Sequence, residues 1–251
     1  MLNLKNKSII QVLFIVNYVR DLAIRTKQFD IEKVLVPLIT TPSFNTNLPD
    51  DFNPQAPRVI FQQNHMSIYF SQLAAQFTID IDHTNDMSLE IIQEKIAKEI
   101  NWFQNCVNKI VPHKQQRERG LVLTMSYPID SALFSDEIIF DYIQSHFFKI
   151  HPFGKPAGAQ FNVGYRTEDN FFITLTVAQY QIIAGKMPNL PVDQWIDMTT
   201  LPIKESGIEL KIDVNSRPLL NTATQPLDIT EVLLKKAFDF AIYKSDKFMG
   251  I

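Results

Sequence analysis

The chain has 251 residues, of which 45% are hydrophobic and 20% charged, a composition typical of globular proteins. Its formal net charge of −3 argues against nonspecific binding of nucleic acid, which requires many cations to neutralise phosphates. The only cysteine is Cys106, which excludes an intramolecular disulfide and a zinc site built from several cysteines.

The first apolar segment, residues 9–16, predicts a buried β-strand over 8–18. It is too short to cross a bilayer as a helix, and no small-residue cleavage site of a signal peptide follows it. Its continuous run of apolar, often β-branched residues is typical of a buried strand. We therefore expect a cytoplasmic protein without a membrane span.

The rest of the first half alternates between helix and strand signals. Asp30 is expected to cap a short helix that ends at Val36, before Pro37. A proline-containing loop follows over 40–57. Three strands are then predicted, over 58–62, 66–71 and 74–82.

The clearest amphipathic helix begins after Ser88, a suitable N-cap, and ends before Pro112. Its apolar residues are spaced three and four apart, which places them on one side of a helix. They are Leu89, Ile92, Ile96, Ile100, Phe103, Val107 and Ile110.

The second half repeats this order. A polar, mostly basic segment over 113–120 precedes a predicted strand over 121–127 and a helix that Ser135 caps. Residues 160–183 alternate strictly around a polar turn at 167–170, which predicts a hairpin. We expect this hairpin to organise the fold.

Two further signals complete the second half. The apolar residues change phase after Val177, which predicts a β-bulge at Val177–Ala178. A strand over 208–214 is followed by a helix that begins at Asp228 with a capping box.

Each half thus contains a strand, a helix, three strands and a helix. The segment 78–82 (TIDID) matches 211–215 (KIDVN), and Val12-Leu13 matches Val122-Leu123. We infer an internal duplication, against the alternative that such an order arose by chance. The predicted fold class is α+β, with antiparallel sheets and helices packed on one face. Two similar halves, 1–112 and 121–251, would be joined by a connector at 113–120 into one compact unit.

Four features span most of this order: the opening strand Ile9–Val16, Trp102-Phe103 in the long helix, the strand Leu121–Tyr127, and the strand end Asp213-Val214-Asn215. Together they resemble an uncharacterised, sporadically distributed family of bacterial proteins of about this length. In that family the strand end is of Asp-x-Asp type, whereas Asn215 replaces the second acid here. The resemblance implies an α+β fold and a bacterial host, and it implies no activity or catalytic residue.

Asp80, Asp82 and His83 are the candidates for a metal site. The two aspartates alternate with isoleucines, so both carboxylates extend from one strand face toward a shared cation. The alternative is a solvated strand face that ends in a polar turn. Two carboxylates and one imidazole leave a hard cation under-coordinated, so we expect no metal site and no cofactor.

The sequence offers little catalytic machinery. It contains no nucleophile elbow and no glycine motif for phosphate binding, and no two of its five histidines have metalloprotease spacing. Cys106 lies beside the apolar stripe of its helix, which indicates a buried structural thiol rather than a nucleophile. We therefore do not expect an enzyme.

A long apolar loop over 187–203 is the candidate contact surface for a partner. Tryptophan and methionine are enriched in the cores of protein interfaces, although packing on the protein's own core would also explain the loop. The predicted partner-binding residues are Met187, Leu190, Trp195, Ile196 and Met198.

These observations favour a non-enzymatic binding or assembly protein that acts through protein–protein recognition, with a bacterial toxin or defence system as its context. The first alternative is an enzyme or small-ligand binder with a pocket between the halves, near Asp80, Asp82 or His83. The second is a nucleic-acid-binding protein that uses the basic segment 113–120 and exposed tyrosines.

Overall fold

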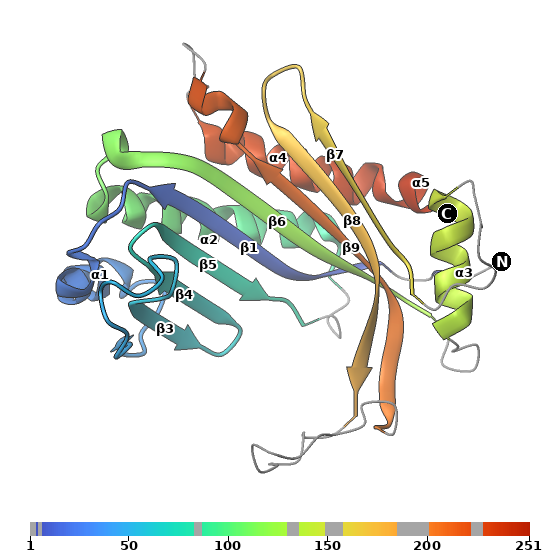
Figure 1. The fold of residues 1–251 in the computed structure, drawn as a ribbon, viewed down its shortest axis with the longest axis horizontal. Helices are drawn as coiled ribbons and strands as arrows, with labels where there is room; N and C mark the ends of the chain where they lie inside the picture. Colours follow the sequence, from blue (N-terminus) through green and yellow to red (C-terminus); the bar gives the residue numbers. More distant parts are fainter. Residues whose placement is uncertain are drawn as a thin grey trace.

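The computed structural model describes residues 4, 7–82, 87–129, 136–148, 158–184, 201–221 and 228–251. Over this part of the chain the fold is α+β, with one nine-stranded antiparallel sheet instead of the several sheets expected (Figure 1). The strands are β1 (Ser8–Tyr18), β2 (Phe44–Asn45), β3 (Val59–Gln63), β4 (Met66–Phe70), β5 (Ala74–Asp80), β6 (Gln116–Pro128), β7 (Gln160–Arg166), β8 (Phe172–Ile183) and β9 (Ile203–Asn215). The α-helices are α1 (Gln28–Leu35), α2 (Leu89–Ile110), α3 (Asp136–Phe147), α4 (Ile229–Tyr243) and α5 (Ser245–Met249). Short 3-10 helices are η1 (Ile24–Lys27), η2 (His113–Gln115) and η5 (Arg217–Asn221).

The centre of the sheet is the antiparallel pair β1–β6. Val12 is opposite Leu123 and Phe14 is opposite Leu121, and all four side chains are buried. The strand order is β2-β3-β4-β5-β1-β6-β9-β8-β7, so the remaining strands extend outward from this pair. The hairpin 160–183, which we expected to organise the fold, forms the edge pair β7–β8. Its alternation marks a strand with one buried face, and an edge strand shows that pattern as clearly as a central one.

The described α-helices pack on one side of the sheet, and in Figure 1 α2 and α4 pass behind the strands. Phe103 of α2 packs against Phe14 of β1 and Phe77 of β5, with ring centroids 6.2 and 5.1 Å apart. α4 lies on β6 and β9, and Phe147 of α3 stacks on Phe161 of β7 at 4.6 Å. Because side chains alternate along each strand, this face carries the apolar core and the opposite face carries the other half of the residues.

Several local predictions are confirmed. The first strand covers Ser8–Tyr18, and the Ser88 hydroxyl caps α2 by accepting from the Ile91 amide. Asp228 caps α4 in the same way through the Glu231 amide. None of the helices described combines the length and apolarity that crossing a bilayer demands.

The predicted β-bulge at Val177–Ala178 is wrong. The pairing of β8 with β9 is regular there, and its register shifts only between Ile182 and Ile183. The change of phase has another cause: Tyr180 lies on the face opposite Val177, where its hydroxyl donates to Glu205 Oε1 at 2.6 Å.

Three boundaries also differ from prediction. Asp30 lies in the first turn of α1, whose N-cap is Lys27 without a side-chain hydrogen bond. β5 ends at Asp80, two residues earlier than expected. Residues 116–120 of the expected connector belong to β6, because they extend its pairing with β1 and β9.

The loop over 40–57 is organised by the buried side chain of Arg58, which is 0% exposed. Its guanidinium donates to the carbonyl oxygens of Ala56 at 2.8 Å, Phe52 at 3.1 Å and Pro49 at 3.2 Å. Asp50 lies 4.0 Å from Nε and contributes a long ion pair. A long loop has few hydrogen bonds of its own, so one buried arginine supplies the donors that its carbonyls need.

Replacing Arg58 with Met should therefore destabilise the fold by about 2–4 kcal/mol, because several buried carbonyls lose their donor. Urea denaturation monitored by circular dichroism measures this loss. The control is Arg117→Met, a matched change at an exposed position, which should cost no more than about 0.5 kcal/mol. Equal losses for both variants would show that Arg58 does not hold the loop.

Candidate functional site

One face of the sheet carries no α-helix in the described part of the chain; we call it the uncovered face. One row of residues crosses it from β5 to β8: Thr78, Leu13, Val122, Asp213 and Thr174 lie opposite one another in register. Leu13 and Val122 are neighbours at the centre of the sheet and are partly exposed. Ile15, the next residue of β1 on this face, is also apolar and partly exposed. Partly exposed apolar side chains at the centre of a sheet are unusual on a strand face that only meets water.

Beside this pair lies a charged cluster at the junction of β1, β6 and η5. Arg217 donates to both carboxylate oxygens of Glu118, at 2.7 and 3.0 Å, and Asn17 donates to Glu118 at 2.9 Å. The hydrogen bond from Arg217 holds the pKa of the Glu118 carboxyl below its usual range. Burial raises the pKa of the neighbouring Asp213, although Asn215 and Arg217 oppose the rise.

A shallow hollow of ≈ 690 Å³ opens next to this cluster. Arg166, Phe172, Thr174, Asp213 and Arg217 are among its lining residues. Its two arginines are already engaged, Arg217 by Glu118 and Arg166 by the Asn170 side chain at 2.8 Å. Because Asn170 is neutral, the Arg166 guanidinium keeps its positive charge, and the hollow combines this charge with an aromatic ring and hydrogen-bonding groups.

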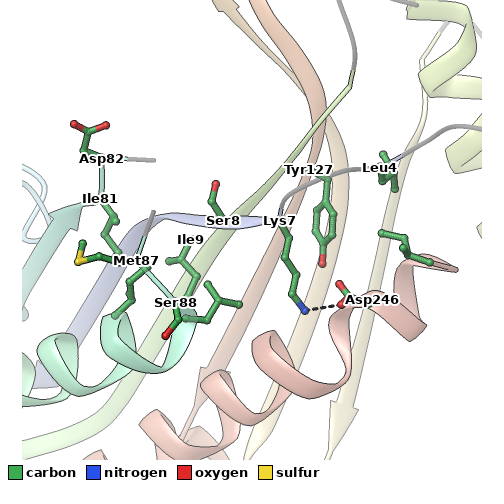
Figure 2. A pocket seen from close by; sticks show the side chains of 13 residues that line it. Leu4, Lys7, Ser8, Ile9, Ile81, Asp82, Met87, Ser88, Tyr127 and Asp246 are labelled. Carbon is green, nitrogen blue, oxygen red and sulfur yellow. Dashed lines mark hydrogen bonds and ion pairs between the residues drawn. The ribbon is translucent and has the colours of Figure 1, made fainter. Parts of the chain in front are cut away.

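A second cavity, the Tyr127 pocket, lies on the covered side between the start of β1, the N-terminus of α2 and α5 (Figure 2). Its volume is ≈ 400 Å³, and its lining includes Lys7, Ile9, Leu89, Tyr127 and Asp246. Segments from both ends of the chain thus meet at one cavity, as Figure 2 shows. The volume falls within the range of about 300–1,000 Å³ that is usual for small-molecule sites.

The metal candidates do not form a metal site in the part of the chain that is described. Asp80 is exposed and accepts a hydrogen bond from Gln11 at 2.8 Å. Asp82 lies beyond the end of β5, and both aspartates line a further cavity of ≈ 310 Å³ with His65 and Lys95. Within the described ranges no three His, Cys, Asp or Glu residues are grouped as metal ligands. His83 lies outside these ranges.

The predicted partner-binding residues Met187, Leu190, Trp195, Ile196 and Met198 also lie outside the described residues. Their role therefore stays a prediction.

Cys106 is buried on α2, where its thiol donates to the Val34 carbonyl oxygen at 3.4 Å. Burial raises the pKa of the thiol to about 11. A thiol with this pKa is protonated near neutral pH and is a poor nucleophile, as the structural interpretation of Cys106 requires.

Sequence reasoning missed the residues that the two sites depend on. The sequence places Leu13 and Val122 in strands but does not place them on a surface. Which face of a strand the helices cover is known only when the pairing of the strands is known. Tyr127 belongs to a strand without any motif. Asn215, at the end of β9, accepts a hydrogen bond from the Arg217 amide at 3.3 Å.

Comparison with known proteins finds no match for this chain: no family model, no curated protein and no solved structure is significantly similar to it. The resemblance to a bacterial family accordingly stays a prediction.

The raised pKa of Asp213 predicts how stability depends on pH. The folded state disfavours the charged carboxylate, so Asp213 lowers stability as the pH rises from the usual aspartate pKa, about 3.9, through the raised folded pKa. Asp213→Asn should therefore raise the urea midpoint at pH 7, and the gain should vanish near pH 3, where the carboxyl is neutral in both states.

Asp80→Asn makes the same chemical change at an exposed position of the same face and should alter the midpoint little. A midpoint for Asp213→Asn at or below that of the wild type at pH 7 would mean that Arg217 and Asn215 outweigh the burial of Asp213.

Proposed function

We propose that the protein is a non-enzymatic binding protein that recognises another protein through the uncovered face of its sheet. The observation that carries this proposal is the partly exposed apolar pair Leu13 and Val122 at the centre of a face without helices. Protein interfaces have an apolar centre, a polar rim and few charges in the core. The rows of threonine, serine and glutamine side chains around the pair provide such a rim.

The charges of the face favour a protein over a nucleic acid. Its strands and the adjoining η5 carry the cations Arg166, Lys211 and Arg217. Five anions accompany them: Asp80, Glu118, Glu205, Glu209 and Asp213. Lys211 is paired with Glu209 at 3.0 Å and Arg217 with Glu118. A surface whose cations are outnumbered, with two of the three paired to carboxylates, releases few counterions from a phosphate backbone.

Cys106 is buried with a raised pKa, so its thiol is a poor nucleophile near neutral pH. The apolar segment 187–203, with Trp195 at its centre, stays part of the proposal as a second contact. A bacterial toxin or defence system is the context that the family resemblance suggests.

We also infer that the two halves arose by duplication. Matching β1 with β6, β3 with β7, β4 with β8 and β5 with β9 reproduces the strand order on either side of the central pair. The register supports the same match: Ile79 pairs with Val12, and Ile212 pairs with Leu123. This register aligns Val12 with Leu123, one residue from the alignment suggested by sequence. A crystal structure in which these strands fail to superpose would contradict the duplication.

Substituting lysine for Leu13 or Val122 should weaken the partner complex about tenfold or more, which corresponds to a loss of at least about 1.4 kcal/mol, because a charge would enter the interface core. The measurement is quantitative mass spectrometry of proteins that co-purify with each variant from source cells. The matched control is Asn105→Lys, which adds the same charge on the exposed side of α2.

A companion that is retained by Asn105→Lys and lost by both face variants supports the uncovered face. Leu13→Cys then adds one accessible thiol to a chain whose natural thiol is buried, and the partner should slow its labelling by a maleimide. Equal retention by all variants, or release of the companion by nuclease, would contradict the proposal. Trp195→Ala tests the second contact in the same assay.

A further inference from the structure

The strand β7 is an open edge of the sheet. Among the described residues it has a neighbouring strand only on the β8 side, and Figure 1 shows it as the outermost strand beyond β8. Its sequence, QFNVGYR, contains no proline or lysine, and its pairing with β8 has no bulge. Natural edge strands are usually short, bulged or protected by such residues, because an open edge offers its backbone groups to another strand. The opposite edge, β2, is only two residues long.

Alternate residues of β7 direct their backbone groups away from β8. The Thr167 amide donates to the Phe171 carbonyl oxygen at 2.8 Å, so these two residues form a hydrogen-bonded pair beside the turn. Hydrogen-bonded and non-hydrogen-bonded pairs alternate along an antiparallel ladder. The residues of β7 whose amides and carbonyls point outward are therefore Gln160, Asn162, Gly164 and Arg166, all of them exposed. Because the surface of a glycine is its backbone, the exposure of Gly164 means that these groups are open to a further strand.

Exposed aromatic side chains accompany this edge on the covered side. Tyr165 shares the parity of Phe161 in β7 and is 48% exposed, and Phe148, just after α3, is 42% exposed. The Phe148 ring meets the Phe161 ring edge-on, with the ring centroids 5.9 Å apart. Half-exposed rings beside open backbone groups are apolar surface that a further strand would bury.

We propose that β7 pairs with β7 of a second copy of this chain, antiparallel and about a two-fold axis, so that the two sheets become continuous. The register that pairs all seven residues places Val163 opposite Val163 of the second copy. In this register the outward-facing residues lie opposite one another, so each such pair exchanges two hydrogen bonds. The proposal does not depend on the partner-binding role of the uncovered face.

The sequence of β7 is complementary to itself in this register, which favours a second copy as the occupant of the edge. Phe161 lies opposite Tyr165 of the second copy, so two aromatic rings pair across the strands on the covered side. Arg166, the only charged residue of β7, lies opposite Gln160, whose amide oxygen can accept from it. Like charges directly opposite each other would destabilise the pair, and this register brings none together within β7.

Sedimentation velocity of the full-length chain at increasing concentration, up to about 100 μM, measures the association. We expect a dimer of twice the 29.0 kDa chain mass. Asn162→Pro removes an outward-facing amide and should weaken the dimer at least about tenfold, because a proline cannot donate to the second copy. The monomer of this variant should stay folded, since an edge strand accepts proline where the amide faces solvent.

Two substitutions of Gln160 test the register without altering the backbone. Gln160→Glu places a carboxylate opposite Arg166 of the second copy and should strengthen the dimer at least about threefold, whereas Gln160→Lys should weaken it by a similar factor. The two-fold axis creates this pair twice, so each effect on the free energy of association is doubled. Because Gln160 is exposed, circular dichroism should show that both variants are folded as the wild type is.

A disulfide between the copies locates the two-fold axis. In the proposed register Val163→Cys places two thiols opposite each other in a non-hydrogen-bonded pair, where Cα atoms about 4.5 Å apart permit a disulfide. Mild oxidation should therefore join the two copies covalently. Tyr165→Cys is the matched control, because its two thiols would lie about four residues apart along the strands, roughly 13 Å. The natural thiol of Cys106 is buried and should not react.

The proposal is overturned if the chain stays a monomer at every concentration, which would leave the edge to a strand of another protein. It is also overturned if Asn162→Pro and both Gln160 variants dimerise as the wild type does. Cross-linking of Tyr165→Cys as readily as that of Val163→Cys would overturn the proposed register.

Discussion

The antiparallel pairing of β1 with β6 is the constraint on which the rest of the structure depends. Both strands have a neighbour on each side, and every other strand is placed relative to this pair. The register that puts Val12 opposite Leu123 sends one set of side chains toward α2 and α4 and the other set to the uncovered face. A slip of one residue would exchange the two sets, burying Gln11 and exposing Phe14, so burial of the core fixes the register strongly.

The same register explains why the uncovered face can carry a function. Residues on the covered side are selected for packing, since Phe14, Phe77 and Phe103 must fit one another. Residues on the other side do not contribute to that core. Leu13 and Val122 are therefore not required by the helix layer, and an interface is a physical reason for apolar side chains there. Because the helices bury one face of the sheet, the sheet does not need its other face to be buried in order to be stable.

Local features of the fold could be predicted from the sequence because their causes are local. Alternation along 208–214 and the caps at Ser88 and Asp228 depend on neighbours in the chain. The pairing of β1 with β6 joins segments more than one hundred residues apart, and no periodic pattern in the sequence predicts it. That is why alternation alone favours an edge hairpin as the organising element.

The sites were less predictable than the elements, for the same reason. Arg58 follows Pro57 without any motif, and its importance comes from carbonyls of Pro49 and Phe52 that the folded loop brings to it. Tyr127 has the parity of the core, so sequence reasoning treats it as one more buried residue. Its place in the wall of a cavity becomes visible only when Lys7 and α5 have been placed. The duplication, in contrast, can be inferred without the structure, because a match such as 78–82 with 211–215 is itself a sequence feature.

The uncovered face and the Tyr127 pocket lie on opposite sides of the same strand, which limits how they can influence each other. Val122 points to the uncovered face, and Tyr127, five residues further along β6, points to the covered one. A ligand beside Tyr127 could change the partner surface only by altering the pairing of β6 with β1 or β9. That pairing also fixes the register of the core, so any such shift would cost core packing. Binding at one site should therefore leave the affinity of the other nearly unchanged, and any coupling that exists must be equal in both directions.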